Sequence, residues 1–226
     1  MNNEQIGISA EVAVADAFHL DVDTDYRMRG DAKTIDVIKK NVPNVFSSYG
    51  VPNPLKHVAE KQNPIDFMLV GEKTLSLKTN KGNLGKVAPE NIGQPTAETY
   101  FEYFKPFVDG DIPPNYEDKR KLFKQISILK IDEVFKMYWT NLFLCDYYIH
   151  FYDVLSGNIK YLVIGKPKVP EIEKSKFSFT QTITTWNESN TVKYNGLTIG
   201  EFQAHRNRNC FKFRFSITGL KEVFSL

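Results

Sequence analysis

Cysteine is scarce in this chain, and no hydrophobic run approaches the length of a membrane-spanning helix. Of its 226 residues only two are cysteines. Cys145 and Cys210 lie in apolar or aromatic stretches with no metal-ligand spacing, so we expect both to be reduced core residues of a cytoplasmic protein. A transmembrane helix needs roughly 18 apolar residues or more, so no membrane partner is expected. The first residues lack the basic and apolar regions of a secretory signal.

Charge of one sign does not dominate either. The formal net charge is +2 at pH 7, which neither indicates nor excludes a nucleic-acid partner, so the local distribution of charge has to decide. Basic residues gather in residues 73–86, 118–124 and 205–214. The sequence also has no G-x-S-x-G motif, no P-loop and no Cys/His metal cluster. Hydrolases built on those motifs are therefore not indicated.

The order of apolar and polar residues predicts a mixed α/β (α+β) chain. Apolar spacing of three and four residues predicts helices over residues 4–18, 32–40, 96–107, 116–126 and 131–145. Proline at position 43 ends the second helix, and residues 44–54 and 80–94 are expected to be loops. Two hairpins are predicted, 65–70 with 74–79 and 149–155 with 159–164, followed by strands over 177–183, 191–194, 197–205 and 210–217. We therefore expect a central mixed sheet flanked by helices, with a strand-rich C-terminal part.

The first hairpin carries a group of residues with chemical potential. Pairing its strands brings Asp66, near the start of one, close to Ser76 and Lys78, near the end of the other. Because side chains alternate along a strand, Ser76 and Lys78 share one face while Leu77 points the other way. A carboxylate and an ammonium on one face can hold a hard cation and a phosphate. The alternative is an ordinary hairpin with a surface Asp–Lys pair, which contributes little energy.

The segments Pro64-Ile65-Asp66 and Ser76-Leu77-Lys78 resemble the core motif of PD-(D/E)xK nucleases, in a variant where serine replaces the second acid. Small Type II restriction endonucleases of this superfamily include members with a non-acidic residue there. The resemblance implies that Asp66 is the main Mg²⁺ ligand and Lys78 the catalytic lysine. Ser76 would be a weak direct or water-mediated ligand, which leaves the second metal position open.

Members of this superfamily often add an acid from the first helix, and Glu11 fits that pattern. The small residues before it would let the helix pack close to the sheet and direct Glu11 toward the hairpin. Glu11 would then be a second metal ligand that partly replaces the missing acid. The alternative is a solvated acid on an amphipathic helix.

Two polar segments are candidates for DNA contact. The first follows the lysine strand and contains Asn80, Lys81 and Asn83, with Gln94 farther along. Asparagine can pair with an adenine edge, and lysine with guanine or phosphate, although a solvated turn has the same composition. The second joins two late strands and is unusually rich in hydrogen-bond donors: Gln203, His205, Arg206, Asn207, Arg208 and Asn209. Such a tip can enter a DNA groove. For Glu201 the sequence leaves two roles open, orienting an arginine or joining the metal site.

The resemblance implies a Type II enzyme that cuts double-stranded DNA by Mg²⁺-assisted attack of water. Such enzymes usually read palindromes as homodimers, and the length and the Asn- and Lys-rich composition would suit a rare AT-rich site. We expect a single domain over residues 1–226, with a helical, catalytic part over 1–145 and a strand-rich, DNA-recognition part over 146–226. A non-catalytic DNA-binding protein and a structure-specific or repair nuclease of the same superfamily are the alternatives.

Overall fold

The chain folds into two compact units, each assembled from two segments of the sequence. The computed structural model describes residues 1–59, 63–93, 95–205 and 209–226, without the side chains of residues 90 and 91. Unit 1 contains Met1–Gly85 and Phe143–Pro167, and unit 2 contains Lys86–Leu142 and Lys168–Leu226. One crossing between units, after residue 142, lies close to the internal boundary expected after residue 145. Single-domain behaviour and the division of labour between the two parts stay predictions.

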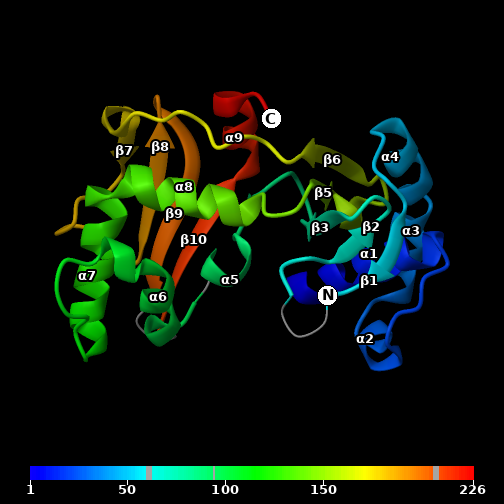
Figure 1. Cartoon of the computed structure of the whole chain (residues 1–226), viewed down its shortest axis with the longest axis horizontal. Coiled ribbons are helices and arrows are strands. Elements are labelled where there is room, and N and C mark those ends of the chain that lie inside the picture. Colours follow the sequence, from blue (N-terminus) through cyan, green and yellow to red (C-terminus); the bar gives the residue numbers. More distant parts are fainter. Residues whose placement is uncertain (60–62, 94, 206–208) are drawn as a thin grey trace. The chain divides into compact units, whose positions relative to one another are not determined.

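Unit 1 is built on a five-stranded mixed sheet (Figure 1). Its strands, in spatial order, are β1 (Pro54–His57), β2 (Phe67–Leu69), β3 (Lys73–Thr79), β5 (Tyr147–Tyr152) and β6 (Lys160–Gly165). Strands β3 and β5 are parallel, and every other neighbouring pair is antiparallel. Both hairpins expected from the sequence, β2–β3 and β5–β6, are present. The short 3-10 helix η3 (Val154–Ser156) occupies the connection in the second.

Four helices belong to unit 1: α1 (Asn3–Ala17), α2 (Thr24–Met28), α3 (Ala32–Lys39) and α4 (Val42–Ser48). Side chains cap the first three, since Asn2, Asp23 and Asp31 each accept a backbone N–H of the first turn. Such caps contribute about 1 kcal/mol each. The apolar residues of α1 join Leu75 and Leu77 of β3 in one buried cluster. Burial of this face therefore fixes the helix against the sheet.

Helix α4 corrects the expectation of a loop over residues 44–54. Pro43 lies in its first turn, where the missing N–H of proline has no partner to lose. Val42, Val45 and Phe46 are buried at helical spacing. The proline therefore lies at the start of α4 and also separates it from α3. Burial of the three apolar side chains stabilises a helix in a segment whose polar composition favours a loop.

Unit 2 contains a second sheet, which is antiparallel throughout. Its strands, in spatial order, are β4 (Lys86–Val87), β10 (Cys210–Ser216), β9 (Leu197–His205), β8 (Ser189–Tyr194) and β7 (Phe177–Phe179). Its helices are α5 (Glu90–Gly93), α6 (Ala97–Phe104), α7 (Tyr116–Leu129), α8 (Ile131–Leu142) and α9 (Ile217–Phe224), with the 3-10 helices η2 (Lys105–Phe107) and η4 (Lys174–Lys176). The mixed α/β class, with a mixed sheet and flanking helices, is confirmed.

An aromatic core joins the helices of unit 2 to one face of this sheet. Phe123 of α7 stacks on Phe211 with ring centroids 4.5 Å apart, and Tyr138 of α8 stacks on Phe213 at 4.3 Å. Alternate residues of β10 point inward, so these rings share one face. These aromatic residues therefore build the core of unit 2. Cys210 of unit 2 and Cys145 of unit 1 are both buried and form no disulfide.

Three further expectations need correction. Residues 80–94 are not entirely loop, because β4 pairs with the end of β10 and α5 follows it. The strand expected over 177–183 ends at residue 179, and helix α9 was not expected at all. Each short element depends on a partner distant in the sequence, which local patterns do not reveal. Within the described ranges, no helix has the length and apolar character needed to cross a membrane.

Candidate active site

The hairpin of β2 and β3 places Asp66 against the end of β3. Phe67 lies opposite Leu75, and continuing this register by one position sets Asp66 opposite Ser76. The backbone N–H of Asp66 donates to the Leu75 carbonyl at 3.0 Å. Its carboxylate Oδ2 accepts the Leu77 N–H at 2.5 Å. The carboxylate, only 8% exposed, is thus fixed beside the segment that contains Ser76 and Lys78.

The two faces of β3 differ in chemistry as the alternation of the sequence predicts. Leu75 and Leu77 belong to the apolar cluster that α1 covers. Ser76 and Lys78 therefore point to the opposite face. A tight turn sets this register, with positive φ at Gly71 (74°) and at Glu72 (58°).

Strand β5 adds two residues to the polar face that the sequence did not identify. In the parallel pairing, Tyr148 lies beside Ser76 and His150 beside Lys78. The Tyr148 hydroxyl and His150 Nδ1 form a hydrogen bond of 3.0 Å. Burial lowers the pKa of His150 to about 3, and the charge of Lys78 contributes to this shift. His150 is therefore neutral at physiological pH and lies within electrostatic reach of the Lys78 ammonium.

Two polar atoms on this face are buried without a hydrogen-bond partner among the described residues. They are Ser76 Oγ and His150 Nε2. A buried polar group without a partner costs about 1–3 kcal/mol, and such groups often mark functional positions or sites of ordered water. His150 lies beside Lys78 in register, and Ser76 lies two residues before Lys78 on the same face of β3. The face therefore has hydrogen-bonding capacity that the protein itself does not use.

Glu11 of α1 is held by two side chains from other elements. Its Oε2 accepts the Tyr26 hydroxyl at 2.6 Å and lies 2.9 Å from His57 Nε2. Burial raises the pKa of Tyr26, and the charges of Glu11 and Asp66 raise it further. Both carboxylates therefore lie within electrostatic reach of one phenol. His57 and Tyr26 could not be identified from the sequence as partners, because they come from β1 and α2.

The donor set suits one kind of metal site. In the described part of the chain, no three His, Cys, Asp or Glu side chains gather to hold a metal ion. A closed structural site is therefore not formed. Mg²⁺, however, is usually bound by one or two carboxylates together with waters and substrate phosphate oxygens. Asp66 and Glu11, whose charges both raise the pKa of Tyr26, are carboxylates of the kind that this open type of site uses.

The loop after β3 has an anchored backbone and exposed side chains. Asn80 Oδ1 accepts the Gly85 N–H at 2.8 Å, and the Asn80 N–H donates to the Phe151 carbonyl at 2.9 Å. Lys81 and Asn83 are exposed. Asn80 therefore has a structural task within the loop, and Lys81 and Asn83 remain accessible for contact. Gln94 lies outside the described residues.

The second DNA-contact candidate lies in unit 2, at the connection of β9 and β10. Gln203 and His205 are on β9, with His205 Nε2 3.1 Å from Gln203 Oε1. Asn209 has a positive φ of 43° and donates to Glu98 at 3.1 Å. Three members of the set lie outside the described residues: Arg206, Asn207 and Arg208. Of the two roles left open for Glu201, its ion pair with Arg214 fits the orienting role.

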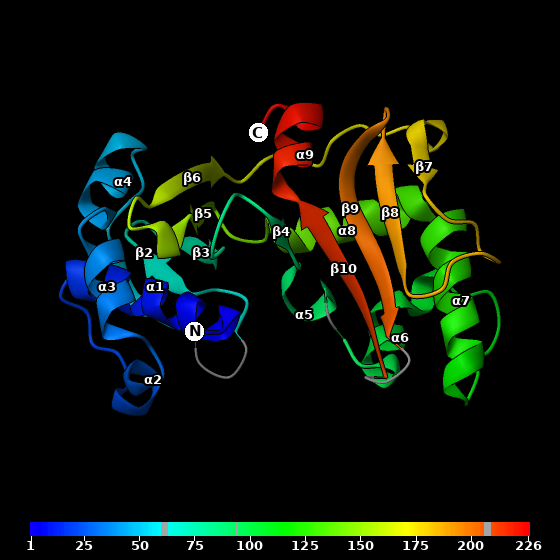
Figure 2. The same cartoon turned by 180° about the vertical axis from the view of Figure 1, so that it is seen from behind.

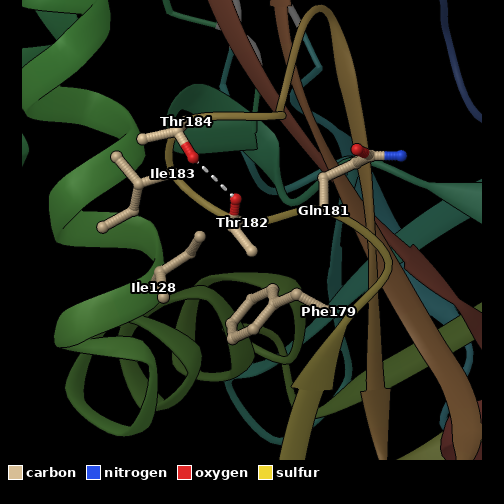
Figure 3. A pocket seen from close by; sticks show the side chains of 6 residues that line it. All are labelled: Ile128, Phe179, Gln181, Thr182, Ile183 and Thr184. Atoms are coloured by element: carbon tan, nitrogen blue, oxygen red, sulfur yellow. Dashed lines mark hydrogen bonds between the residues drawn. The ribbon is translucent and has the colours of Figure 1, made fainter.

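A pocket in unit 2 is lined by residues of different chemistry: Ile128, Phe179, Gln181, Thr182, Ile183 and Thr184 (Figure 3). The hydroxyls of Thr182 and Thr184 hydrogen-bond to each other at 3.0 Å. No ionisable side chain is among the lining residues. This pocket therefore offers neither an acid nor a base, unlike the Asp66–Lys78 hairpin.

Comparison with known proteins finds a Type II restriction enzyme among the similar sequences. Over 173 residues the chain is 35% identical to the "Type II restriction enzyme CviAII" of Paramecium bursaria Chlorella virus 1. The chain is similar to a Type II restriction enzyme. The aligned region is 75% of this chain and 47% of CviAII, so the chain spans about half the length of that relative. The similarity to CviAII confirms the resemblance to Type II restriction enzymes inferred from the motif. No protein-family model and no solved structure matches the chain.

Proposed function

We propose that this protein is a Mg²⁺-dependent, site-specific endonuclease that hydrolyses phosphodiester bonds of double-stranded DNA. The observation that carries the proposal is the Asp66 carboxylate, held by the Leu77 N–H beside Ser76 and Lys78. The similarity to CviAII supports the same activity. In this proposal the sheet of unit 1 is the core of a PD-(D/E)xK nuclease, with serine at the position of the second acid.

Each side chain of the site has a separate role in the proposed reaction. Asp66 and Glu11 would hold Mg²⁺, which supplies charge neutralisation at the phosphate and a more acidic water when bound. Lys78 stabilises the negative charge that develops on the phosphate and positions the attacking water. Ser76 Oγ offers a neutral oxygen on the same face, suited to a water-mediated contact.

Glu11 compensates for the missing second acid in this proposal. A carboxylate held by the Tyr26 hydroxyl and His57 cannot rotate freely, so its position is set before substrate binds. The charge of Asp66 also reaches Tyr26. Both acids therefore lie within electrostatic reach of one phenol, which supports a shared role.

DNA contact extends the proposal to the two polar segments and to assembly. Lys81 and Asn83, exposed on the loop after Lys78, are suited to contact DNA next to the cleaved bond. The connection of β9 and β10 would read bases or grip phosphates through Gln203, His205, Asn209 and the residues between them. A homodimer would read both halves of a palindrome, because site symmetry mirrors protein symmetry.

Cleavage of DNA of known sequence tests the function. A bacteriophage genome is digested with and without Mg²⁺, and the ends of the fragments are sequenced. We expect discrete bands only with Mg²⁺, at one short sequence. Asp66→Ala and Lys78→Ala are expected to lower the cleavage rate at least 100-fold. Asp66→Ala removes a proposed ligand of Mg²⁺, and Lys78→Ala removes the positive charge that would stabilise the reacting phosphate.

Lys73→Ala is the matched control for the lysine. It lies on the same strand, is exposed and pairs with Asp146 at 3.1 Å, so its loss should leave cleavage within twofold of the wild type. Asp36→Ala, an exposed acid of α3, is the control for Asp66. Binding without cleavage under any Mg²⁺ concentration would establish the non-catalytic alternative. Cleavage governed by DNA structure rather than sequence would establish the repair-nuclease alternative.

A further inference from the structure

One face of the sheet in unit 2 carries mostly polar side chains, and no helix of the described residues lies across it. Figure 1 shows α8 crossing one face of β8, β9 and β10, and Figure 2 shows the same strands from the other side, with α8 behind them. Phe202, Phe211 and Phe213 point toward the helices. By alternation and pairing, the opposite face carries Lys86, Ser189, Thr191, Lys193, Glu201, Gln203, Lys212, Arg214 and Ser216.

Glu201 organises the centre of this face. It is only 7% exposed, and its carboxylate accepts hydrogen bonds from Lys86 of β4 and Arg214 of β10. Gln203 donates to the same carboxylate at 2.7 Å and lies 3.1 Å from His205. Side chains from three strands therefore form one connected row that ends at His205.

The charge state of Glu201 follows from these contacts. Burial alone would raise its pKa, but the hydrogen bonds and charges of Lys86 and Arg214 outweigh burial, and the pKa is lowered. The carboxylate is therefore ionised at neutral pH and holds both cations in place. Such charge-assisted contacts fix a guanidinium more firmly than solvent does.

The two cations nevertheless remain accessible. The side chains of Lys86 and Arg214 are 36% and 39% exposed, so each has one side on Glu201 and another facing solvent. Lys193 and Lys212 are partly exposed on the same face. The residues named on this face therefore include four cationic side chains and one carboxylate. An excess of ordered positive charge fits a polyanion.

We propose that this open face binds the phosphate backbone of duplex DNA. The proposal rests on the proposed function, which makes DNA the substrate, and adds residues that the motif does not indicate. Lys212 and Arg214 alternate on one strand, about 7 Å apart. Two successive steps of a DNA strand cover about the same distance along the helix axis. The lysines and the arginine would contact phosphates, and sequence would be read elsewhere.

Binding without metal tests the surface separately from catalysis. A fluorescent 30-base-pair duplex of mixed sequence is titrated in EDTA at several salt concentrations. Lys193→Ala/Lys212→Ala should raise the Kd at least fivefold, because two phosphate contacts with their released counterions are lost. The slope of log K against log salt should fall by about 2. Neither lysine forms an ion pair recorded in the described structure, so the fold should persist.

The double variant Lys105→Ala/Lys136→Ala removes the same charge from exposed helical positions of unit 2. It should bind with an unchanged salt slope. Equal affinity and slope for the wild type and Lys193→Ala/Lys212→Ala would overturn the surface proposal, even if the enzyme cuts DNA. If Lys193→Ala/Lys212→Ala binds DNA more weakly and the wild-type chain does not cut DNA with Mg²⁺, the surface proposal is supported and the proposed function is overturned.

Discussion

At the scale of single residues, the polar face of β3 and β5 contains more than the nuclease motif. Ser76 and His150 are buried, and the described structure gives Ser76 Oγ and His150 Nε2 no hydrogen-bond partner. The ring of His150 is bound only through Nδ1, by Tyr148. A buried polar atom without a hydrogen bond costs free energy of folding, and this cost is tolerated where the group serves the reaction or holds water. The neutral imidazole beside Lys78 therefore deserves a direct measurement of its ionisation.

The depressed pKa of His150 makes stability depend on pH. Its pKa is about 3 in the folded protein and about 6.5 in the unfolded chain. Between these values the unfolded chain binds more protons, so stability falls as the pH falls below 6.5. The free energy of unfolding should drop by about 2–3 kcal/mol from pH 6.5 to 4.5 through this group. Urea unfolding of the wild type and His150→Gln at several pH values measures the difference.

His19→Asn is the control for this experiment. His19 is exposed and has a positive φ of 57°, a conformation that asparagine tolerates. This variant should keep the pH dependence of the wild type. If His150→Gln keeps it as well, the imidazole of His150 is not held neutral by burial.

At the scale of elements, the sequence predicts those helices and strands whose formation depends on residues close together in the chain. The β2–β3 hairpin could be predicted because alternation and a tight turn at Gly71-Glu72 lie within 15 residues. Helix α4 could not, since its polar composition matches a loop and only burial against the core makes it helical. The residues of the candidate active site also differ in how well the sequence predicts them. Asp66 and Lys78 come from one hairpin, whereas His150 enters through a parallel pairing across some 70 residues of sequence.

Helix α2 supplies a hydroxyl whose removal tests the role of Glu11. Tyr26, which is half-buried, donates to the Glu11 carboxylate at 2.6 Å. Tyr26→Phe should lower the free energy of unfolding by about 1–2 kcal/mol, as for hydrogen bonds to charged groups. It should also raise the Mg²⁺ concentration needed for half-maximal cleavage, because Glu11 is less firmly held. Cleavage rates over a Mg²⁺ titration measure this effect.

Tyr49→Phe provides the comparison, since Tyr49 is 53% exposed. Both properties should stay at wild-type values in that variant. An unchanged Mg²⁺ requirement in Tyr26→Phe, with the expected loss of stability, would show that Glu11 has a structural task only. The metal would then depend on Asp66 and water.

At the scale of the whole molecule, the chain crosses between its two units three times, after residues 85, 142 and 167. The proposed catalytic hairpin belongs to unit 1, and the proposed phosphate-binding face belongs to unit 2. A sequence read from one end to the other suggests consecutive parts, because interleaving depends on contacts between distant segments. The two proposals together predict that substitutions in unit 1 alter cleavage and that substitutions on the face in unit 2 alter DNA binding.

Double-strand cleavage makes a demand on assembly that can be measured. A single site of the proposed kind would hydrolyse one phosphodiester bond at a time, so cutting both strands together at a fixed position would require a second site. In a two-fold homodimer the partner supplies it. Wild-type chain refolded with a ninefold excess of Lys78→Ala chain would then be mostly in mixed dimers. We expect supercoiled plasmid to be converted first to nicked circles, whereas wild type alone gives linear DNA directly. Linear DNA formed in proportion to the wild-type chain, with no nicked circles, would show that one chain cuts both strands.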